Sequence, residues 1–312
     1  MHLIPARDIR AALTWESAVQ ALSEGHRGAQ PKVQDLLIND AAFTLFGRGV
    51  ILPGHGAGMK IASIFPPNAD RPVPTPVEDA AFVVVDEDSK RIRAILDGPE
   101  LTRWKTAADS ALGARLLSRE DSATLLVIGA GPVAFALAEA HLHVRPSLTR
   151  VLLWNRTQAR LRPLAERLSA EGHADVQIVT DLARALAEAD IISSATGVSD
   201  PLIAGALLKP GAHVDLVGGF TPRMREADDT TITRATVFVD YRATTIEKAG
   251  DICQPIADGI LTPDAVRGDL FDLIRAPHAR AADEITLFKN AGGAHIDLLV
   301  AAAVLARAPG GE

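Results

Sequence analysis

The amino-acid sequence predicts an α/β protein in which a doubly wound parallel sheet is joined to a smaller α+β part. From about residue 123 to 290, apolar strand-like runs alternate with helix-like runs, the order of a parallel sheet covered by helices on both faces. From about residue 33 to 95, apolar runs follow one another with Pro and Gly between them, which is typical of strands joined by turns. The 312 residues are enough for two such domains.

In the smaller part, a short strand is expected first, then a helix over residues 11–29 with Thr14 as a plausible N-cap. Strands are expected at residues 40–46, 58–65 and 79–86. Residues 66–76 contain too many prolines for either regular element, so they are predicted as an ordered loop. A helix over residues 101–117 follows, with Asp97 and Gly98 ahead of it.

The sheet-forming part should alternate strands with helices. We expect strands at residues 124–128, 149–155, 176–179, 191–197, 213–219 and 236–240. A further apolar run at 284–290 precedes Gly292 and Gly293, which open a last helix at 294–306. That helix is so apolar that it should pack back on the smaller part. We therefore divide the chain into residues 1–115 with 293–312, and residues 116–292.

Composition excludes several classes of protein. A formal net charge of −7 argues against nucleic acid as a partner. The single cysteine, Cys253, excludes an intramolecular disulfide framework and a thiolate metal cluster. No signal peptide is visible, and no apolar run reaches membrane-spanning length. The nine histidines show no metal-binding spacing. We expect a cytoplasmic globular protein with no metal site and no membrane partner.

The most informative stretch is the strand, glycine turn and helix at residues 124–142. Gly129 permits a tight turn, Gly131 allows a diphosphate to approach the backbone, and Ala134 keeps the helix close to the sheet. The N-terminus of the helix offers unpaired N–H groups to phosphates. The strand before and the helix after match the context that such a motif requires. The turn therefore predicts a dinucleotide site at Gly129, Ala130, Gly131, Pro132 and Val133.

The end of the next strand bears on which dinucleotide is bound. Asn155 lies 21 residues after Ala134, at the position where an acidic residue would bind the ribose hydroxyls and repel a 2′-phosphate. Here Asn155 is followed by Arg156 and Thr157, and then by Arg160. Neutral, cationic and hydroxyl groups favour a 2′-phosphate, so we predict NADP(H) over NAD(H), which remains possible. The alternative is that Arg156 is only a solvated surface side chain.

Two further strand ends should border the nicotinamide half of the cofactor, because ligands of such sheets lie at the carboxyl ends of the strands. The residues predicted to contact the cofactor there are Ala195, Thr196 and Gly197 at one strand end, and Val217, Gly218 and Phe220 at the other.

With these segments in view, the chain resembles the ornithine cyclodeaminase/mu-crystallin family along nearly its whole length. The matching stretches are Lys60 before Phe65-Pro66 and Asn68, LTRWKTAADS at 101–110, GAG at 129–131, READD at 225–229, and EITLFKNAG at 284–292. The resemblance implies a homodimer whose first domain forms the interface and closes the active site over a Rossmann domain. It also implies a nicotinamide cofactor and a small amino- or imino-acid substrate.

Departures from the family pattern bear on the substrate site. The family motif usually reads LTxxRTAA, and here the arginine is Lys105, which supplies a point charge in place of a planar fork. The other carboxylate-binding arginine falls on Lys32, or Arg48 takes its role. Lys60 sits among apolar residues, where a charge is costly unless it is used. We assign Lys60 and Lys105 to the substrate carboxylate, with Lys60 relaying the proton; the alternative for each is a solvated surface lysine.

The remaining site residues rest on the same resemblance. Thr106 is predicted to hydrogen-bond the cofactor, or else to bond its own helix backbone. Lys289 and Asn290 end a strand near the cofactor.

A last departure separates the reactions known in the family. Cyclodeaminases carry Gly-Gly-Asp where this chain has Gly218-Gly219-Phe220, and a phenyl ring cannot handle the substrate's amino group. We therefore expect NADPH-dependent reduction of 1-pyrroline-2-carboxylate or 1-piperideine-2-carboxylate to proline or pipecolate. The alternatives are an NAD-dependent ornithine cyclodeaminase, which yields proline and ammonia, and a non-catalytic, crystallin-like nicotinamide-binding protein.

Overall fold

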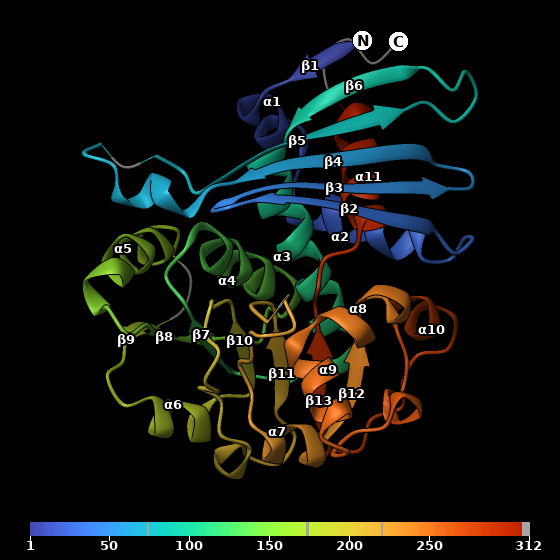
Figure 1. Cartoon of the computed structure of the whole chain (residues 1–312). Helices are drawn as coiled ribbons and strands as arrows, with labels where there is room; N and C mark the ends of the chain where they lie inside the picture. Colours follow the sequence, from blue (N-terminus) through green and yellow to red (C-terminus); the bar gives the residue numbers. More distant parts are fainter. Residues whose placement is uncertain (74, 173–174, 220, 308–312) are drawn as a thin grey trace. The chain divides into compact units, whose positions relative to one another are not determined.

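The computed structural model describes residues 1–73, 75–172, 175–219 and 221–307. The chain forms two compact units, residues 1–105 with 293–312 (unit 1) and residues 106–292 (unit 2) (Figure 1). Helix α3 (Gly98–Leu117) runs through the point at which the first unit gives way to the second. The predicted division into domains at residues 115/116 and 292/293 stays a prediction.

Unit 1 is built on a six-stranded sheet with the order β1-β6-β5-β4-β3-β2, in which only β1 and β6 pair in parallel and the other neighbours are antiparallel. Its strands are β1 (His2–Ile4), β2 (Lys32–Asp40), β3 (Phe43–Leu52), β4 (Gly56–Ile64), β5 (Glu78–Val85) and β6 (Ile92–Asp97). Its helices are α1 (Ala6–Ala12), α2 (Trp15–Gly25), α11 (Ala294–Leu305) and the 3₁₀ helix η1 (Pro66–Asp70).

The predicted helix over residues 11–29 is wrong in its bounds, because Thr14 interrupts it. Thr14 is extended, with φ −118° and ψ 159°. Its hydroxyl accepts the Ser17 N–H at 3.2 Å while the Ser17 hydroxyl accepts the Thr14 N–H at 3.0 Å, a reciprocal capping box. The prediction that Thr14 is an N-cap is therefore confirmed, and the chain before it forms the separate helix α1.

Other boundaries also move. The sequence interpretation missed β2 and β6 and took Asp40 as the start of a strand, whereas a turn at residues 41–42 joins β2 to β3. Part of the proline-rich loop is a short 3₁₀ helix, since two prolines fix the φ angles of its first turn. The predicted packing of the last helix is confirmed, because α11 contacts α2, β3 and β4 and lies behind the sheet in Figure 1.

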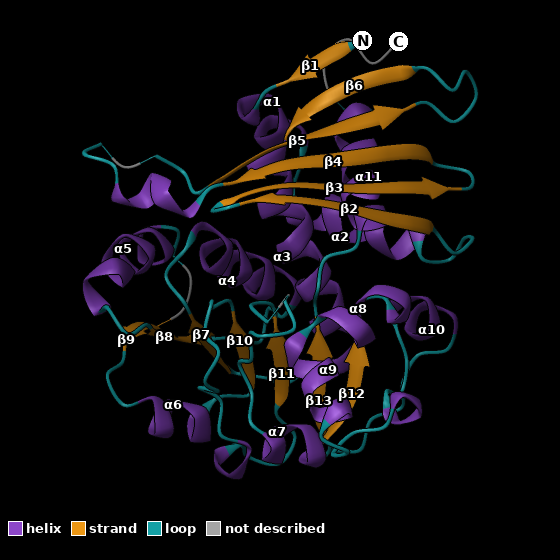
Figure 2. Ribbon diagram, in the orientation of Figure 1, coloured by secondary structure: helices purple, strands orange, loops and turns teal. Residues whose placement is uncertain are grey.

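Unit 2 contains an entirely parallel seven-stranded sheet with the order β12-β13-β11-β10-β7-β8-β9 (Figure 2). Its strands are β7 (Thr124–Ile128), β8 (Arg150–Trp154), β9 (Asp175–Ile178), β10 (Ile191–Ser194), β11 (His213–Leu216), β12 (Ala235–Val239) and β13 (Ile285–Lys289). The strand order reverses on either side of β7, which confirms the predicted doubly wound fold.

Helices cover both faces of this sheet, and each face has its own apolar core. One core includes Leu126, Ile192 and Val214 with residues of α6, α7 and α9; the other includes Leu125 and Val127 with residues of α4 and α5. The α-helices after α3 are α4 (Pro132–Val144), α5 (Arg162–Ala170), α6 (Leu182–Glu188), α7 (Asp229–Arg234), α8 (Arg242–Lys248), α9 (Gly250–Ala257) and α10 (Leu270–Arg275). The 3₁₀ helices are η2 (Gln158–Leu161), η3 (Gly205–Leu207) and η4 (Pro263–Ala265). Within the described residues, no helix combines the length and apolarity needed to cross a membrane.

A buried histidine pair joins α2 to α11 inside unit 1. The His26 Nδ1 lies 2.7 Å from the Leu22 carbonyl oxygen, and its Nε2 lies 3.2 Å from the His295 Nε2. The carbonyl needs a donor, so the proton of neutral His26 sits on Nδ1 and its Nε2 accepts from His295. Burial lowers the pKa of His26 to about 4, against the opposing influence of the Leu22 carbonyl.

This pair predicts sensitivity to acid. Because the folded pKa of His26 lies below its ordinary value of 6.5, the unfolded chain binds more protons between the two values. The contribution of His26 to stability is therefore complete above pH 6.5 and is lost as pH falls toward 4, by on the order of 3 kcal/mol. A His26→Gln variant should lose this part of the acid sensitivity in urea unfolding between pH 7 and about 4.5. The exposed His55→Gln control should behave as the wild type; equal acid sensitivity in all three proteins would contradict the assignment.

Candidate active site

Cationic side chains gather on one face of the sheet of unit 1. In the register of β2, β3 and β4, Asp35 lies opposite Arg48, and Arg48 lies opposite Lys60. Residues that are directly opposite in antiparallel strands project to the same face. Lys60 is 9% exposed, so its ammonium group is buried.

The groups that hold these cations differ. Lys60 donates from Nζ to the hydroxyl of Thr102 at 2.6 Å, and that hydroxyl donates to the Gly98 carbonyl at 2.7 Å. Arg48 makes a two-pronged ion pair with Asp35, with Nε–Oδ1 at 2.7 Å and Nη2–Oδ2 at 2.9 Å. The hydrogen bond of Lys60 thus goes to a neutral hydroxyl, whereas Arg48 is matched by a carboxylate.

Lys105 brings a second lysine into the same unit. It is 6% exposed, and its Nζ lies 3.7 Å from Oδ2 of Asp297, in the first turn of α11. Burial lowers the pKa of Lys60 below 10.5; Asp297 opposes this effect, and Lys105 adds to it. Arg48, Lys60 and Lys105 form a lysine cluster in which Asp35 pairs with Arg48, Asp297 lies near Lys105, and Asp297 and Glu78 both act on Lys60. Two lysines buried in this way suit a small anion.

The structure does not bring Lys32 to the lysine cluster. Lys32 lies opposite Ile51 in the register of β2 and β3, in the alternate set of positions from Asp35 and Arg48. Because side chains alternate between the faces of a strand, Lys32 projects to the opposite face of the sheet from Lys60. The assignment of Lys32 to the same carboxylate site is therefore not supported within this chain.

In unit 2, the glycine turn has the geometry that a diphosphate requires. Gly129 has φ +130°, and a Cβ there would lie 2.7 Å from the Ala195 carbonyl oxygen, so the turn needs glycine. Gly131 is the N-cap of α4, no side chain caps that helix, and a Cβ at Gly131 would meet nothing within 4 Å. Pro132 and Val133 follow as the first helical residues. The turn thus leaves open space beside a helix N-terminus, which fits a dinucleotide.

The end of β8 carries no carboxylate. Asn155 follows the strand, and its side-chain nitrogen donates to the Thr157 carbonyl at 2.9 Å. Arg156, Thr157 and Arg160 are exposed. Cations at this strand end therefore remain accessible to a ligand. Their role as cofactor contacts stays a prediction.

The ends of β10 and β11 are joined by a residue that the sequence interpretation did not single out. Glu226 is fully buried, and its carboxylate accepts hydrogen bonds from Ser194, which ends β10, from Thr196, which follows it, and from Gly218, after β11. It belongs to the READD run at residues 225–229, one of the stretches that carry the family resemblance. The signal in the sequence that could have identified Glu226 is its place seven residues after the glycine pair Gly218-Gly219. Of the neighbouring cofactor predictions, Ala195 and Val217 are half-buried and Gly197 is exposed, while Phe220 lies outside the described residues.

Lys289, Asn290 and Thr106 have internal partners in unit 2. Lys289 is fully buried at the end of β13, with Nζ 3.1 Å from Oδ2 of Asp251. Asn290 donates from Nδ2 to the Thr106 carbonyl at 2.9 Å and to the Ser110 hydroxyl at 3.0 Å. These bonds favour a supporting role beneath the strand ends for Lys289 and Asn290. Direct contact of the three residues with a cofactor stays a prediction.

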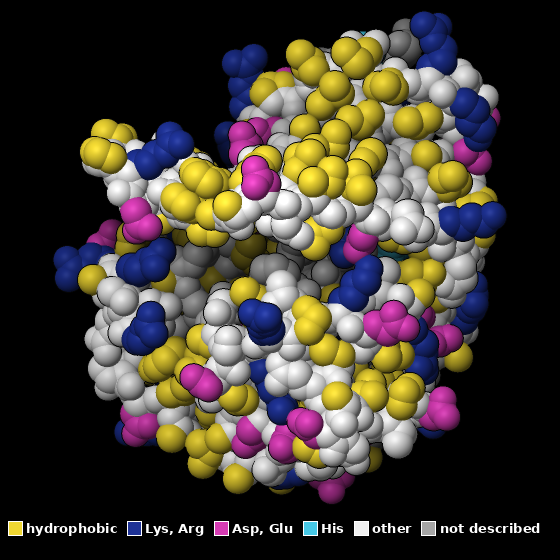
Figure 3. Space-filling model, viewed as in Figure 1, with side chains coloured by type: hydrophobic (Ala, Val, Ile, Leu, Met, Phe, Trp, Pro, Cys, Tyr) yellow, Lys and Arg dark blue, Asp and Glu magenta, His cyan; other side chains and the backbone are white. Residues whose placement is uncertain are grey.

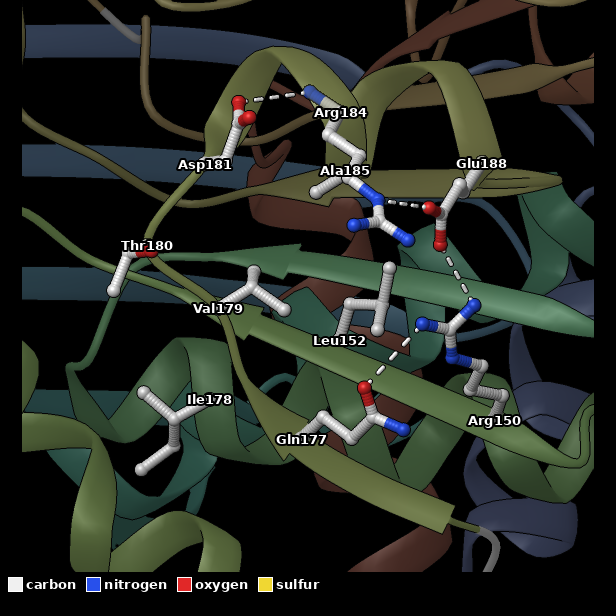
Figure 4. A pocket seen from close by; sticks show the side chains of 10 residues that line it. All are labelled: Arg150, Leu152, Gln177, Ile178, Val179, Thr180, Asp181, Arg184, Ala185 and Glu188. Atoms are coloured by element: carbon white, nitrogen blue, oxygen red, sulfur yellow. Dashed lines mark hydrogen bonds and ion pairs between the residues drawn. The ribbon is translucent and has the colours of Figure 1, made fainter.

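A surface pocket of about 270 Å³ lies elsewhere in unit 2, against β8, β9 and α6 (Figure 4). None of the predicted site residues lines it. Its two guanidinium groups are both engaged by Glu188, at 2.7 Å from Arg150 and 2.7 Å from Arg184. This pocket therefore presents compensated charge and does not coincide with the glycine turn. Among the residues that the structure describes, no group of three or more His, Cys, Asp or Glu side chains is placed to hold a metal ion.

Comparison with known proteins agrees with this arrangement of elements. A sequence model of the ornithine cyclodeaminase/mu-crystallin family matches residues 18–312. The chain belongs to that family. It is 45% identical over 296 residues to Δ(1)-pyrroline-2-carboxylate reductase of Paracoccus denitrificans, a match that covers 94% of this chain and 93% of that protein. The resemblance inferred from the five sequence motifs is thereby confirmed.

Two solved structures have the same fold. The structure of Thermococcus litoralis Δ(1)-pyrroline-2-carboxylate reductase in complex with NADH and L-proline aligns with a TM-score of 0.90 at 22% identity, over 97% of this chain and 96% of that one. The iminosuccinate reductase of Paracoccus denitrificans in complex with NAD⁺ aligns with a TM-score of 0.87 at 27% identity, over 99% and 96%. The predicted combination of a Rossmann sheet with an α+β unit is confirmed.

The open space at Gly131 predicts a selective effect of a single methyl group. Gly131→Ala should leave the thermal midpoint within a few degrees of the wild type, because the added Cβ meets no protein atom. The same Cβ should obstruct the diphosphate and raise the Kd for NADPH at least about ten-fold. Fluorescence titration measures the Kd, and Gly49→Ala, where a Cβ also has room, is the matched control. Unchanged NADPH binding in Gly131→Ala would show that the diphosphate lies elsewhere.

Proposed function

We propose that this protein is an NADPH-dependent reductase of cyclic imino acids, which converts 1-pyrroline-2-carboxylate or 1-piperideine-2-carboxylate to proline or pipecolate. The observation that carries the proposal is the buried, positively charged lysine cluster of Lys60, Lys105 and Arg48, in a chain that is 45% identical to a Δ(1)-pyrroline-2-carboxylate reductase. Burying an ammonium group is costly, and a bound anion offsets that cost.

The lysine cluster suits the substrate's carboxylate. We assign the carboxylate to the ammonium groups of Lys60 and Lys105, with Arg48 contributing its charge from the adjacent strand. Asp297 then helps to hold the Lys105 ammonium group in place, since the two groups lie 3.7 Å apart. Point charges of this kind hold a small anion without the planar geometry that an arginine fork imposes.

Reduction of the C=N bond adds a hydride to carbon and a proton to nitrogen. The cofactor supplies the hydride when it is bound. Lys60 is our candidate for the proton donor, because burial lowers the pKa of its ammonium and so makes proton release easier. Thr102 fixes the direction of the Lys60 ammonium through the 2.6 Å hydrogen bond. Positive charge at the carboxylate also favours electron flow toward the imine.

NADP(H) is our proposed cofactor, with NAD(H) as the alternative. The glycine turn offers room for the diphosphate, and Asn155, in place of an acidic residue, leaves no charge to repel a 2′-phosphate. The exposed Arg156 and Arg160 supply positive charge at that strand end. The iminosuccinate reductase that shares the fold was solved with NAD⁺, so the preference has to be decided by these side chains in this chain.

A homodimer is proposed from the outer face of the unit 1 sheet. Figure 3 shows hydrophobic side chains gathered over these strands. The most exposed are Leu3 at 71%, Ile51 at 57%, Ile38 at 52%, Ile92 at 52%, Leu36 at 50% and Ile61 at 42%. Contiguous exposed apolar surface is typical of an interface. We infer that a second copy of the chain covers this face. Sedimentation equilibrium tests the inference: the mass of a single chain would show that the dimer is wrong. We also propose that the protein acts in the cytoplasm.

The decisive assay combines the protein with NADPH and 1-pyrroline-2-carboxylate. Rapid loss of NADPH absorbance with formation of proline is the expected result. Ammonia release from ornithine in the presence of NAD⁺ would instead indicate a cyclodeaminase. Tight NADPH binding with neither reaction would indicate a non-catalytic, crystallin-like protein.

Lys105→Ala tests the substrate assignment within that assay. The KM for the imino acid should rise about ten-fold or more, because a charged hydrogen bond is worth about 1.5–3 kcal/mol, while the Kd for NADPH stays within about two-fold. The double variant Lys105→Ala with Asp297→Asn removes the carboxylate left unpaired, and Lys105→Arg should retain substrate binding. Equal losses of substrate and cofactor affinity would show that Lys105 does not serve the substrate.

Arg156→Ala tests the cofactor preference. Loss of a charge-assisted contact to the 2′-phosphate should raise the Kd for NADPH about ten-fold and leave the Kd for NADH unchanged. Arg162→Ala, at an exposed position on the next helix, is the control. A wild-type protein that binds NADH as tightly as NADPH would refute the preference.

A further inference from the structure

The carboxylate of Glu226 links two strand ends inside unit 2. Its Oε1 accepts hydrogen bonds from the Ser194 hydroxyl at 2.6 Å, the Thr196 hydroxyl at 2.7 Å and the Thr196 N–H at 2.8 Å. Its Oε2 accepts the Gly218 N–H at 2.5 Å. Ser194 ends β10, and Gly218 follows β11 by two residues, so one side chain fixes the carboxyl ends of two adjacent parallel strands.

A buried ion pair holds Glu226 in place. Asp251, at the start of α9, accepts on Oδ1 the N–H groups of Glu226 at 2.7 Å and Ala227 at 3.2 Å. Its Oδ2 lies 3.1 Å from Nζ of Lys289 at the end of β13. Glu226, Asp251 and Lys289 are each fully buried. Three separate segments therefore converge beneath the ends of β10 and β11, and the ammonium group of Lys289, which pairs with Asp251, also acts electrostatically on Glu226.

The backbone packs so tightly here that glycine is required. A Cβ on Gly218 would collide with the Thr196 carbonyl oxygen and with the carboxylate of Glu226, and a Cβ on Gly219 would collide with Asp251. The loop after β11 therefore packs directly against Thr196, Glu226 and Asp251.

This arrangement determines what the two strand ends can offer a ligand. The N–H groups of Thr196 and Gly218, and the hydroxyl of Thr196, are all directed to Glu226. The groups that remain at these positions are carbonyl oxygens, which accept hydrogen bonds but cannot donate them. A carboxamide NH₂ is a matching donor.

We propose that Glu226 is the positioning residue for the nicotinamide half of the cofactor: it fixes the ends of β10 and β11 and withdraws their N–H groups, so that these ends present no competing donor to the nicotinamide carboxamide. The proposal rests on the proposed function in one respect, that unit 2 binds a nicotinamide dinucleotide. Glu226 itself touches only protein, and it acts through Thr196 and Gly218.

Protonation of Glu226 should disturb this arrangement. Burial raises the pKa of Glu226 to about 6; Lys289 opposes the rise, Asp251 adds to it, and the hydroxyls of Ser194 and Thr196 lower it. A protonated carboxyl group would place a hydrogen among groups that all donate toward it. NADPH affinity is therefore expected to fall as pH drops below about 6.

The test compares NADPH with 2′-phospho-ADP-ribose, the same molecule without nicotinamide, by isothermal titration calorimetry. In Glu226→Gln, the Kd for NADPH should rise about ten-fold while the Kd for the fragment stays within about two-fold. Asp215→Asn is the matched control, because Asp215 is another fully buried carboxylate of the same sheet, bonded to the Ser193 hydroxyl at 2.6 Å. It should bind both ligands as the wild type does.

Ser194→Ala provides a second test in case Glu226→Gln fails to fold. It removes one hydrogen bond that favours ionised Glu226, so the midpoint of the pH dependence of NADPH affinity should move upward, with no change for the fragment. Equal losses of both ligands in Glu226→Gln, or a Ser194→Ala profile identical to the wild type, would overturn the proposal. If the wild type binds neither ligand, the cofactor assignment itself fails and this proposal fails with it.

Discussion

Ionised side chains that are removed from water constrain both units of this protein. An unpaired buried charge destabilises a fold by several kcal/mol, so each such group needs a partner or a ligand. In unit 2 the requirement is met internally, because Lys289 forms an ion pair with Asp251, and Glu226 accepts hydrogen bonds from the ends of two strands. In unit 1 the buried ammonium group of Lys60 is held instead by the neutral hydroxyl of Thr102. The buried ion pair of unit 2 thus supports the backbone, whereas the ammonium group of Lys60 in unit 1 is suited to a ligand.

The parallel sheet explains why the two kinds of site take different forms. Parallel strands bring their carboxyl ends to one edge, where turns and helix N-termini supply backbone groups. At that edge Gly129 and Gly131 leave space, and Glu226 decides which polar groups of Thr196 and Gly218 remain available. The antiparallel strands of unit 1 instead align side chains across the sheet, which places Arg48 beside Lys60. The parallel sheet of unit 2 thus offers a ligand mainly backbone groups, and the antiparallel strands of unit 1 offer it side chains.

Much of the fold could be predicted, and the errors have physical causes. The strand at 124–128 and the helix after it were recognisable because apolar periodicity and glycine chemistry agree there. The bounds near Thr14 were wrong, because a capping box ends one helix and starts another where periodicity continues. Strand β2 was missed because most of its residues are exposed on both faces, so it lacks the alternation that marks a half-buried strand.

The sequence by itself determined the family, the parallel sheet with its glycine turn, and the presence of Lys60 and Lys105 in apolar surroundings, because local patterns record backbone conformation and burial. Only the tertiary structure decided that Lys32 projects to the opposite sheet face from Lys60, since one residue of strand register reverses a side chain. It also decided that Glu226, Asp251 and Lys289 meet. Those residues come from separate segments of the chain. No local sequence pattern predicts contact between charged residues that are so far apart.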